Sequence, residues 1–66
     1  MMSTLEFYLQ RAEAADRDAE VATLQNVRER HIASKQAWLS MADRLERTTA
    51  ARAENEAVKA LAATPD

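Results

Sequence analysis

Apolar residues recur at spacings of three and four in the middle of the chain, the spacing of one face of an α-helix. This face comprises Leu24, Val27, His31, Ser34, Trp38, Met41 and Leu45. An earlier face has the same spacing and tapers from bulky residues to alanines: Leu5, Tyr8, Leu9, Ala12, Ala15, Ala19 and Ala22. The pattern predicts two helices, and the taper allows a neighbouring helix to approach the alanine end closely.

The two faces are out of phase with each other. Positions seven apart on the first face are Leu5, Ala12 and Ala19, whose series would continue two residues after Leu24, where the second face begins. A shift of two residues is about 200° around a helix, so one straight helix cannot keep both faces on one side. Either the chain turns near residues 21–26, or a continuous helix presents two faces to two partners.

Capping signals favour the turn. Ser3 and Glu6 fit a capping box at the start of the first helix, and Asn26 and Glu29 fit a second one, with Thr23 as an alternative cap. Two features favour the continuous helix. The chain has no glycine to end the first helix, and a minor stripe could run through the junction: Phe7, Ala14, Val21, Ile32 and Leu39.

We therefore expect an all-α, antiparallel helical hairpin with helices at about residues 3–22 and 25–48. The second helix has no clear stop before Thr64-Pro65, so it could extend to residue 63. In that case it is about 57 Å long against about 30 Å for the first helix. Residues 50–66 would then be either frayed or packed on another chain.

The composition indicates one small domain that needs a partner. The chain has 66 residues, and its 47% hydrophobic content includes fifteen alanines, which bury little area. The apolar arc of the second helix, from Met41 round to Ile32, is wider than one alanine-tapered helix can cover. These observations predict self-association, as a homodimeric four-helix bundle.

Charge and cysteine content narrow the function classes. Residues 1–23 carry two basic and five acidic groups, whereas residues 24–49 carry five basic and three acidic groups, which suits two helices packed together. The chain has no cysteine and no apolar stretch of membrane-spanning length. A cytoplasmic protein with no membrane association is expected.

The sequence predicts no catalytic or metal site, and we expect a protein that is not an enzyme and has no cofactor. One histidine without cysteine cannot form a closed zinc site in one chain. His31 and Ser34 are three residues apart on one face, but a glycine-free helical pair offers no loop for an oxyanion hole. Both are better interpreted as polar positions that set register in a helical interface.

Trp38 is the strongest candidate for an anchor of that interface, because tryptophan is enriched among the residues that dominate binding energy. We therefore predict an interface for self-association, or for a protein partner, that comprises Leu5, Tyr8, Leu9, Val27, His31, Trp38, Met41 and Leu45. The protein would be a non-catalytic interaction module with a regulatory role.

The alternative function is RNA binding by the hairpin. Its candidate contacts are Arg28, Arg30, Lys35, Arg44 and Arg47. They spread round most of the helix, with Glu29, Asp43 and Glu46 among them. A dedicated phosphate-binding surface is more concentrated and more basic, so nucleic-acid binding is the weaker hypothesis.

The run "TLQNVRERHIASKQAWLSMADRLERTTAARA", with "FYLQRAEAA" ahead of it, resembles a family of very small alphaproteobacterial proteins over about residues 5–53. The shared features are an N-terminal aromatic-Arg-Ala helix, an Asn-Val-Arg-Glu-Arg turn and an Ala-Trp-x-x-Met-Ala core. The resemblance implies no activity. In architecture alone the chain is similar to the plasmid RNA-regulating hairpin that dimerises into a four-helix bundle, and no residue role is carried over from it.

Overall fold

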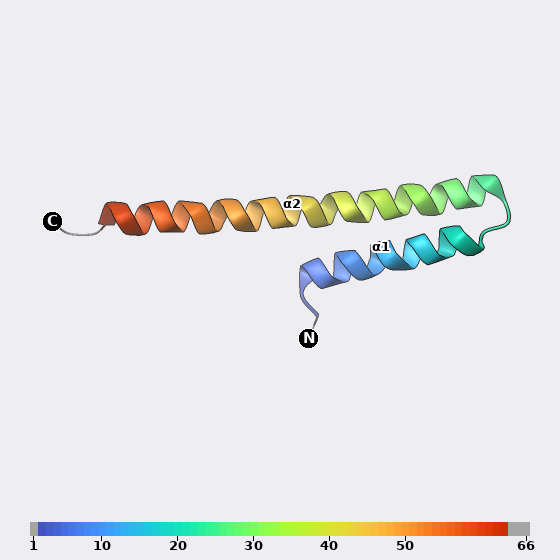
Figure 1. The fold of residues 1–66 in the computed structure, drawn as a ribbon, viewed down its shortest axis with the longest axis horizontal. Helices are drawn as coiled ribbons and strands as arrows, with labels where there is room; N and C mark the ends of the chain where they lie inside the picture. Colours follow the sequence, from blue (N-terminus) through green and yellow to red (C-terminus); the bar gives the residue numbers. More distant parts are fainter. Residues whose placement is uncertain (1, 64–66) are drawn as a thin grey trace.

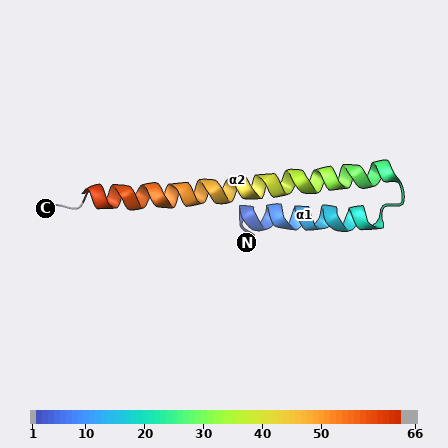
Figure 2. The ribbon, with the colours of Figure 1, turned by 45° about the horizontal axis from the view of Figure 1, so that its top comes forward.

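The protein is an antiparallel hairpin of two helices of unequal length, seen in a computed structural model that describes residues 2–63. Helix α1 spans Thr4–Val21 and helix α2 spans Gln25–Ala63. The two helices lie side by side in Figures 1 and 2, and α2 continues far beyond the start of α1. The molecule measures 67 × 24 × 10 Å, so it is a rod one helix thick. The predicted hairpin and the longer of the two predicted lengths for the second helix are confirmed, and the continuous single helix is wrong.

Helix α1 begins at the predicted cap. The hydroxyl oxygen of Ser3 accepts a hydrogen bond of 3.1 Å from the backbone N–H of Glu6, and the Ser3 carbonyl accepts one of 3.0 Å from Phe7. The helix ends without glycine because Ala22 leaves helical geometry with extended angles, φ −70° and ψ 130°. Such angles need no left-handed residue, so the missing glycine does not prevent a turn.

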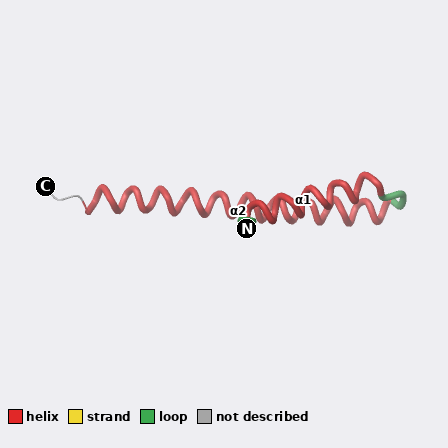
Figure 3. The backbone as a smooth tube through the Cα atoms, turned by 90° about the horizontal axis from the view of Figure 1, so that it is seen from below, coloured by secondary structure: helices red, strands yellow, loops and turns green. Residues whose placement is uncertain are grey.

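The turn contains residues 22–24 and appears as the short loop at one end of Figure 3. The guanidinium of Arg28 closes it by donating a 2.9 Å hydrogen bond to the carbonyl of Ala22. The backbone N–H of Arg28 also donates to the carbonyl of Leu24, which starts α2 one residue before the predicted cap. Asn26 therefore lies inside the first turn, and its predicted capping role is wrong, as is that of the alternative, Thr23.

Helix α2 passes through Thr48 and Thr49 without interruption. The Thr48 hydroxyl donates a 2.9 Å hydrogen bond to the carbonyl of Arg44 within the same helix, so it does not compete for a turn. Residues 50–63 are helical, and whether they fray or pack on another chain stays a prediction. The last part of that prediction, residues 64–66, lies outside the described residues.

The core between the helices consists of small side chains. The buried hydrophobic residues of the described part are Ala12, Ala15, Ala19 and Ala42. Three of the four belong to α1, at the spacing that the sequence pattern predicts. Since alanine has no side chain beyond Cβ, this core permits close approach of the helices but removes little apolar area from water.

The contact line of α2 differs from the predicted stripe at several positions. Lys35 and Ala42 are more buried than Ser34 and Met41, each of which is exposed. His31, Trp38 and Leu45 keep the seven-residue spacing, but Lys35 and Ala42 on one flank of that line face α1, whereas Ser34 and Met41 on the other flank do not. Leu24 is 62% exposed because it belongs to the turn rather than to the packed helix.

Candidate interaction surface

An aromatic cluster joins the two helices where the bulky residues lie. The Trp38 ring of α2 meets the Phe7 ring edge-on at a centroid distance of 5.7 Å and the Tyr8 ring at 5.8 Å. The guanidinium of Arg11 lies 5.7 Å from the centre of the Trp38 ring, within the range of a cation–π contact. Three residues of α1 thus surround one residue of α2, and Trp38 anchors the hairpin itself.

The same side of the hairpin continues as a shallow groove of about 270 Å³. Its lining includes Arg11, Asp18, His31, Ser34 and Trp38. We call this surface, together with Phe7, the aromatic side. His31 is half-buried and Ser34 is exposed. The described residues 2–63 contain no cluster of three His, Asp or Glu side chains that could hold a metal ion.

The opposite side of the hairpin carries aliphatic residues around one ion pair. The ammonium of Lys35 donates a 2.8 Å hydrogen bond to the carboxylate of Asp16. Both residues line a groove of about 330 Å³ with Ile32. Leu9 and Leu39 lie one heptad away from Asp16 and Ile32 on their helices, so they share this side. We call these five residues the aliphatic side.

Much apolar surface is left exposed over the whole molecule. The exposed large hydrophobic residues within the described range are Met2, Phe7, Leu9, Val21, Leu24, Ile32, Leu39, Met41, Val58 and Leu61. They lie on both sides of the hairpin and along the part of α2 beyond α1. The apolar side chains that a compact domain would bury are therefore available for contact with another molecule.

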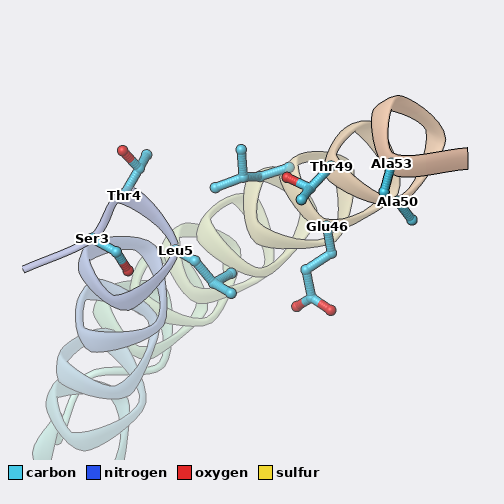
Figure 4. Close-up of a pocket in the computed structure, with 8 residues that line it drawn as sticks. Ser3, Thr4, Leu5, Glu46, Thr49, Ala50 and Ala53 are labelled. Carbon is cyan, nitrogen blue, oxygen red and sulfur yellow. The ribbon is translucent and has the colours of Figure 1, made fainter. Parts of the chain in front are cut away.

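A third groove lies where α1 begins beside α2, and its volume is about 460 Å³. Figure 4 shows Ser3, Thr4 and Leu5 at the start of α1, next to the stretch of α2 that continues past them. The α2 residues that line it are Leu45, Glu46, Thr49, Ala50 and Ala53. This groove marks the boundary between the covered and the uncovered part of α2.

The structure brings together only part of the predicted interface. Tyr8 contacts Trp38, and Tyr8 also lines a groove with Met41 and Leu45. Leu5 lies beside Leu45 in the groove at the start of α1. These residues therefore serve the packing of the hairpin, and whether they also contact a second chain stays a prediction.

The other three predicted interface residues differ in their positions. Val27 and His31 are half-buried between the helices, whereas Leu9 is 43% exposed, on the aliphatic side. The prediction omitted Phe7 and Arg11, although both cover Trp38. Phe7 could have been found from the minor stripe of residues seven apart that starts with it. No pattern in the sequence indicates that Arg11 contacts Trp38.

The five basic residues of the RNA-binding alternative do not form one surface. Lys35 is paired with Asp16, and Arg28 is bonded to the turn. Arg47 pairs with Asp43 at 2.8 Å within α2. Lys35 and Arg47 are thus paired with carboxylates, which reduces the charge available for phosphate groups, and the Arg28 side chain is held at the turn.

Comparison of the chain with protein families, with characterised proteins and with solved structures finds no match. The resemblance to small alphaproteobacterial proteins therefore stays a prediction. No helix within residues 2–63 combines the length and apolar character needed to cross a membrane.

Proposed function

We propose that the protein acts by self-association, as a homodimer of two hairpins with four helices in all, and that it serves as a non-catalytic interaction module. The observation that carries the proposal is the contrast between its core and its surface. The buried hydrophobic residues of the described part are four alanines, whereas ten larger apolar residues are exposed. A hairpin with so little buried area gains little free energy to offset the entropy of folding.

The total surface supports the same proposal. The accessible surface is 5565 Å² for a chain of 7.4 kDa. A compact monomer of this mass exposes about 4,200 Å². The surplus is larger than the roughly 800 Å² that each partner contributes to a stable interface of standard size. One hairpin therefore has enough surface to bury against a second copy.

Sedimentation equilibrium of the full chain between about 1 and 100 µM tests the proposal. The expected result is a mass twice that of the 7.4 kDa chain, with a melting temperature that rises with concentration because folding and association are linked. A helical, cooperatively melting monomer across this range would contradict the proposal.

The second candidate function, RNA binding, has weaker support because three of its five basic residues are held in contacts within the chain. A gel shift in about 50 mM salt distinguishes the candidates, since binding through phosphate contacts weakens steeply as salt is added. Tight, salt-sensitive binding by a protein that stays monomeric would replace self-association with this function.

A further inference from the structure

From residue 47 on, α2 passes the start of α1, and beyond Ala53, which lines the groove there, no helix of the described residues lies beside it. We call residues 47–63 the overhang. Every residue of the overhang is exposed, and Val58 and Leu61 are 59% and 77% exposed. At 100° per residue, Ala53, Ala57 and Leu61 lie within an arc of about 80°. The opposite face of the overhang carries Arg52 and Lys59, so this segment is amphipathic.

The apolar face of the overhang is in line with the aliphatic side of the hairpin. At 100° per residue, five positions of α2 fall within an arc of about 40°: Ile32, Leu39, Ala50, Ala57 and Leu61. One apolar stripe thus runs along both halves of α2. It is interrupted at the middle, where Asp43, Glu46 and Arg47 stand.

From this placement we propose that the overhang packs, as a third helix, along the aliphatic side of the hairpin of a second copy. The two α2 helices run antiparallel, so each copy supplies an overhang and receives one. This arrangement rests on the proposed self-association and specifies which surfaces meet. Four helices are present in the dimer, and three of them lie side by side wherever an overhang covers a hairpin.

The lengths of the segments match this arrangement. The contact of Asp16 with Lys35 and the shared groove of Leu5 and Leu45 place the start of α1 beside Glu46. The overhang that remains is about 26 Å long, and α1, with 18 residues, is about 27 Å. A two-fold axis between residues 46 and 47 therefore sets the overhang of each copy along the covered half of the other, with the two α1 helices end to end.

The charges at the axis favour the antiparallel direction. Glu46 and Arg47 are neighbours in the sequence, so a two-fold axis between them places Glu46 of each copy level with Arg47 of the other. A parallel pair would instead place like charges level with each other. Exposed pairs of this kind add little affinity, but they discriminate between orientations.

The groove at the start of α1, drawn in Figure 4, is lined by Leu45, Glu46 and Thr49, so it lies beside the proposed axis. Its lining includes Leu5, Leu45, Ala50 and Ala53. In the proposed dimer the second α2 passes across the open side of this groove and removes its apolar lining from water. Apolar contacts at the groove therefore lie beside the charged residues that interrupt the stripe of α2.

Disulfide cross-linking tests the arrangement. The chain has no cysteine, so an introduced one has no competitor. Gln36 and Ala57 are level with each other across the proposed axis, but within one chain they are about 31 Å apart, too far for a disulfide. We expect a mixture of the Gln36→Cys and Ala57→Cys proteins to form linked dimers under mild oxidation, and each protein alone to form almost none.

The control for this experiment uses Asn55→Cys in place of Ala57→Cys. Asn55 lies about 160° from Ala57 around the helix. It should not link to Gln36→Cys. Linked dimers of each single variant alone would indicate a parallel pair and overturn the arrangement. A dimer by sedimentation that shows no link between the two variants would also overturn it, while leaving the proposed self-association standing.

A matched pair of substitutions provides a second measurement on the full chain. Ala53 and Ala62 are both exposed alanines of the overhang and lie about 180° apart around the helix. Ala53→Glu should raise the dimer dissociation constant at least tenfold, and Ala62→Glu less than twofold, at equal helix content by circular dichroism. Equal effects of the two would contradict the arrangement, and a monomeric unmodified protein would remove it together with the proposed function.

Discussion

The two halves of α2 have the same helical geometry but opposite environments. The half beside α1 holds its side chains against another helix, with Val27, His31, Trp38 and Ala42 on the contact line. The overhang has every residue exposed, yet it continues as a regular helix to Ala63. The overhang is rich in alanine, so its helix is favoured by intrinsic propensity without a neighbouring helix. Packing of α2 against α1 depends instead on where bulky residues recur along α2.

The covered half is itself divided. At the end nearer the start of α1, three aromatic rings and Arg11 surround the contact between the helices. Toward the turn, alanines such as Ala15 and Ala19 are buried instead. Large rings remove far more apolar area from water than methyl groups do, so most of the stabilisation of the hairpin comes from the aromatic end. The following substitutions test this division, from the largest expected effect to the smallest.

Trp38→Ala should have the largest effect. It removes the ring that Phe7, Tyr8 and Arg11 all contact, and for this half-buried side chain we expect a loss of about 3 kcal/mol in the free energy of unfolding. Urea or thermal unfolding monitored by circular dichroism measures it. Val58→Ala, in the overhang, is the control and should leave the unfolding of isolated hairpins nearly unchanged at high dilution. Equal losses would contradict the contrast between the two halves of α2.

Ala15→Leu tests the alanine end. Ala15 is buried against α2, so a larger side chain must push the helices apart, at a cost of about 1–3 kcal/mol in unfolding free energy. The same substitution at Ala37, an exposed position of α2, should be close to neutral. Thermal melting of the two variants side by side gives the comparison. A more stable Ala15→Leu protein would mean that the helices are not closely packed there.

Sequence reasoning predicted the hairpin because one observation, the two-residue offset between the apolar faces, is geometric and independent of propensity. It placed the start of α2 at residue 25, where the structure has it, but assigned the cap to Asn26, since a capping box is a local signal and the bond from Arg28 to the turn depends on the folded arrangement. It also listed Met41 where Ala42 is the buried residue. Met41 and Ala42 lie on opposite flanks of the line through His31, Trp38 and Leu45, and the apolar pattern alone does not show which flank faces the first helix.

The candidate surface was predictable only in part. Trp38 was identified by residue type and spacing, and its contact with Tyr8 is present. The partners Phe7 and Arg11 were not identified, because neither belongs to the apolar face of the first helix that the sequence pattern defines. The sequence also could not show that Asp16 and Lys35 meet, since their pairing depends on the register of two helices joined by an irregular turn.

Ser3→Ala tests how much the cap at the start of α1 contributes to the stability of the hairpin. The Ser3 hydroxyl satisfies the backbone N–H of Glu6, and its loss should cost about 1 kcal/mol. Ser3→Asp restores an acceptor and should recover most of the stability. Ser40→Ala, an exposed serine inside α2, is the control, with no loss expected. The melting temperatures of the three proteins decide the matter, and an unchanged value for Ser3→Ala would show that α1 does not depend on its cap.

The smallest effect is expected at the ion pair of Asp16 and Lys35, which differs from the other ion pairs of the described residues because it joins the two helices. The pairs of Glu13 with Arg17 and of Asp43 with Arg47 each lie within one helix. In an isolated hairpin the side chains of Lys35 and Asp16 are 34% and 47% exposed, so solvent screens their attraction, and the measurement is made at high dilution for this reason. A double-mutant cycle with Asp16→Asn and Lys35→Met should give a coupling energy of about 0.5 kcal/mol.

Added salt distinguishes the electrostatic contribution of Asp16 and Lys35 from the apolar contribution of Trp38. In about 1 M sodium chloride the coupling should fall toward zero, because the screening length is then shorter than the span of an exposed pair and its surroundings. The packing of Trp38 should keep its full effect in the same salt, since burial of apolar area does not depend on charge. If the coupling exceeded 2 kcal/mol, or survived high salt, the pair would be a principal link between the helices, and the aromatic end would not account for most of the stability of the hairpin.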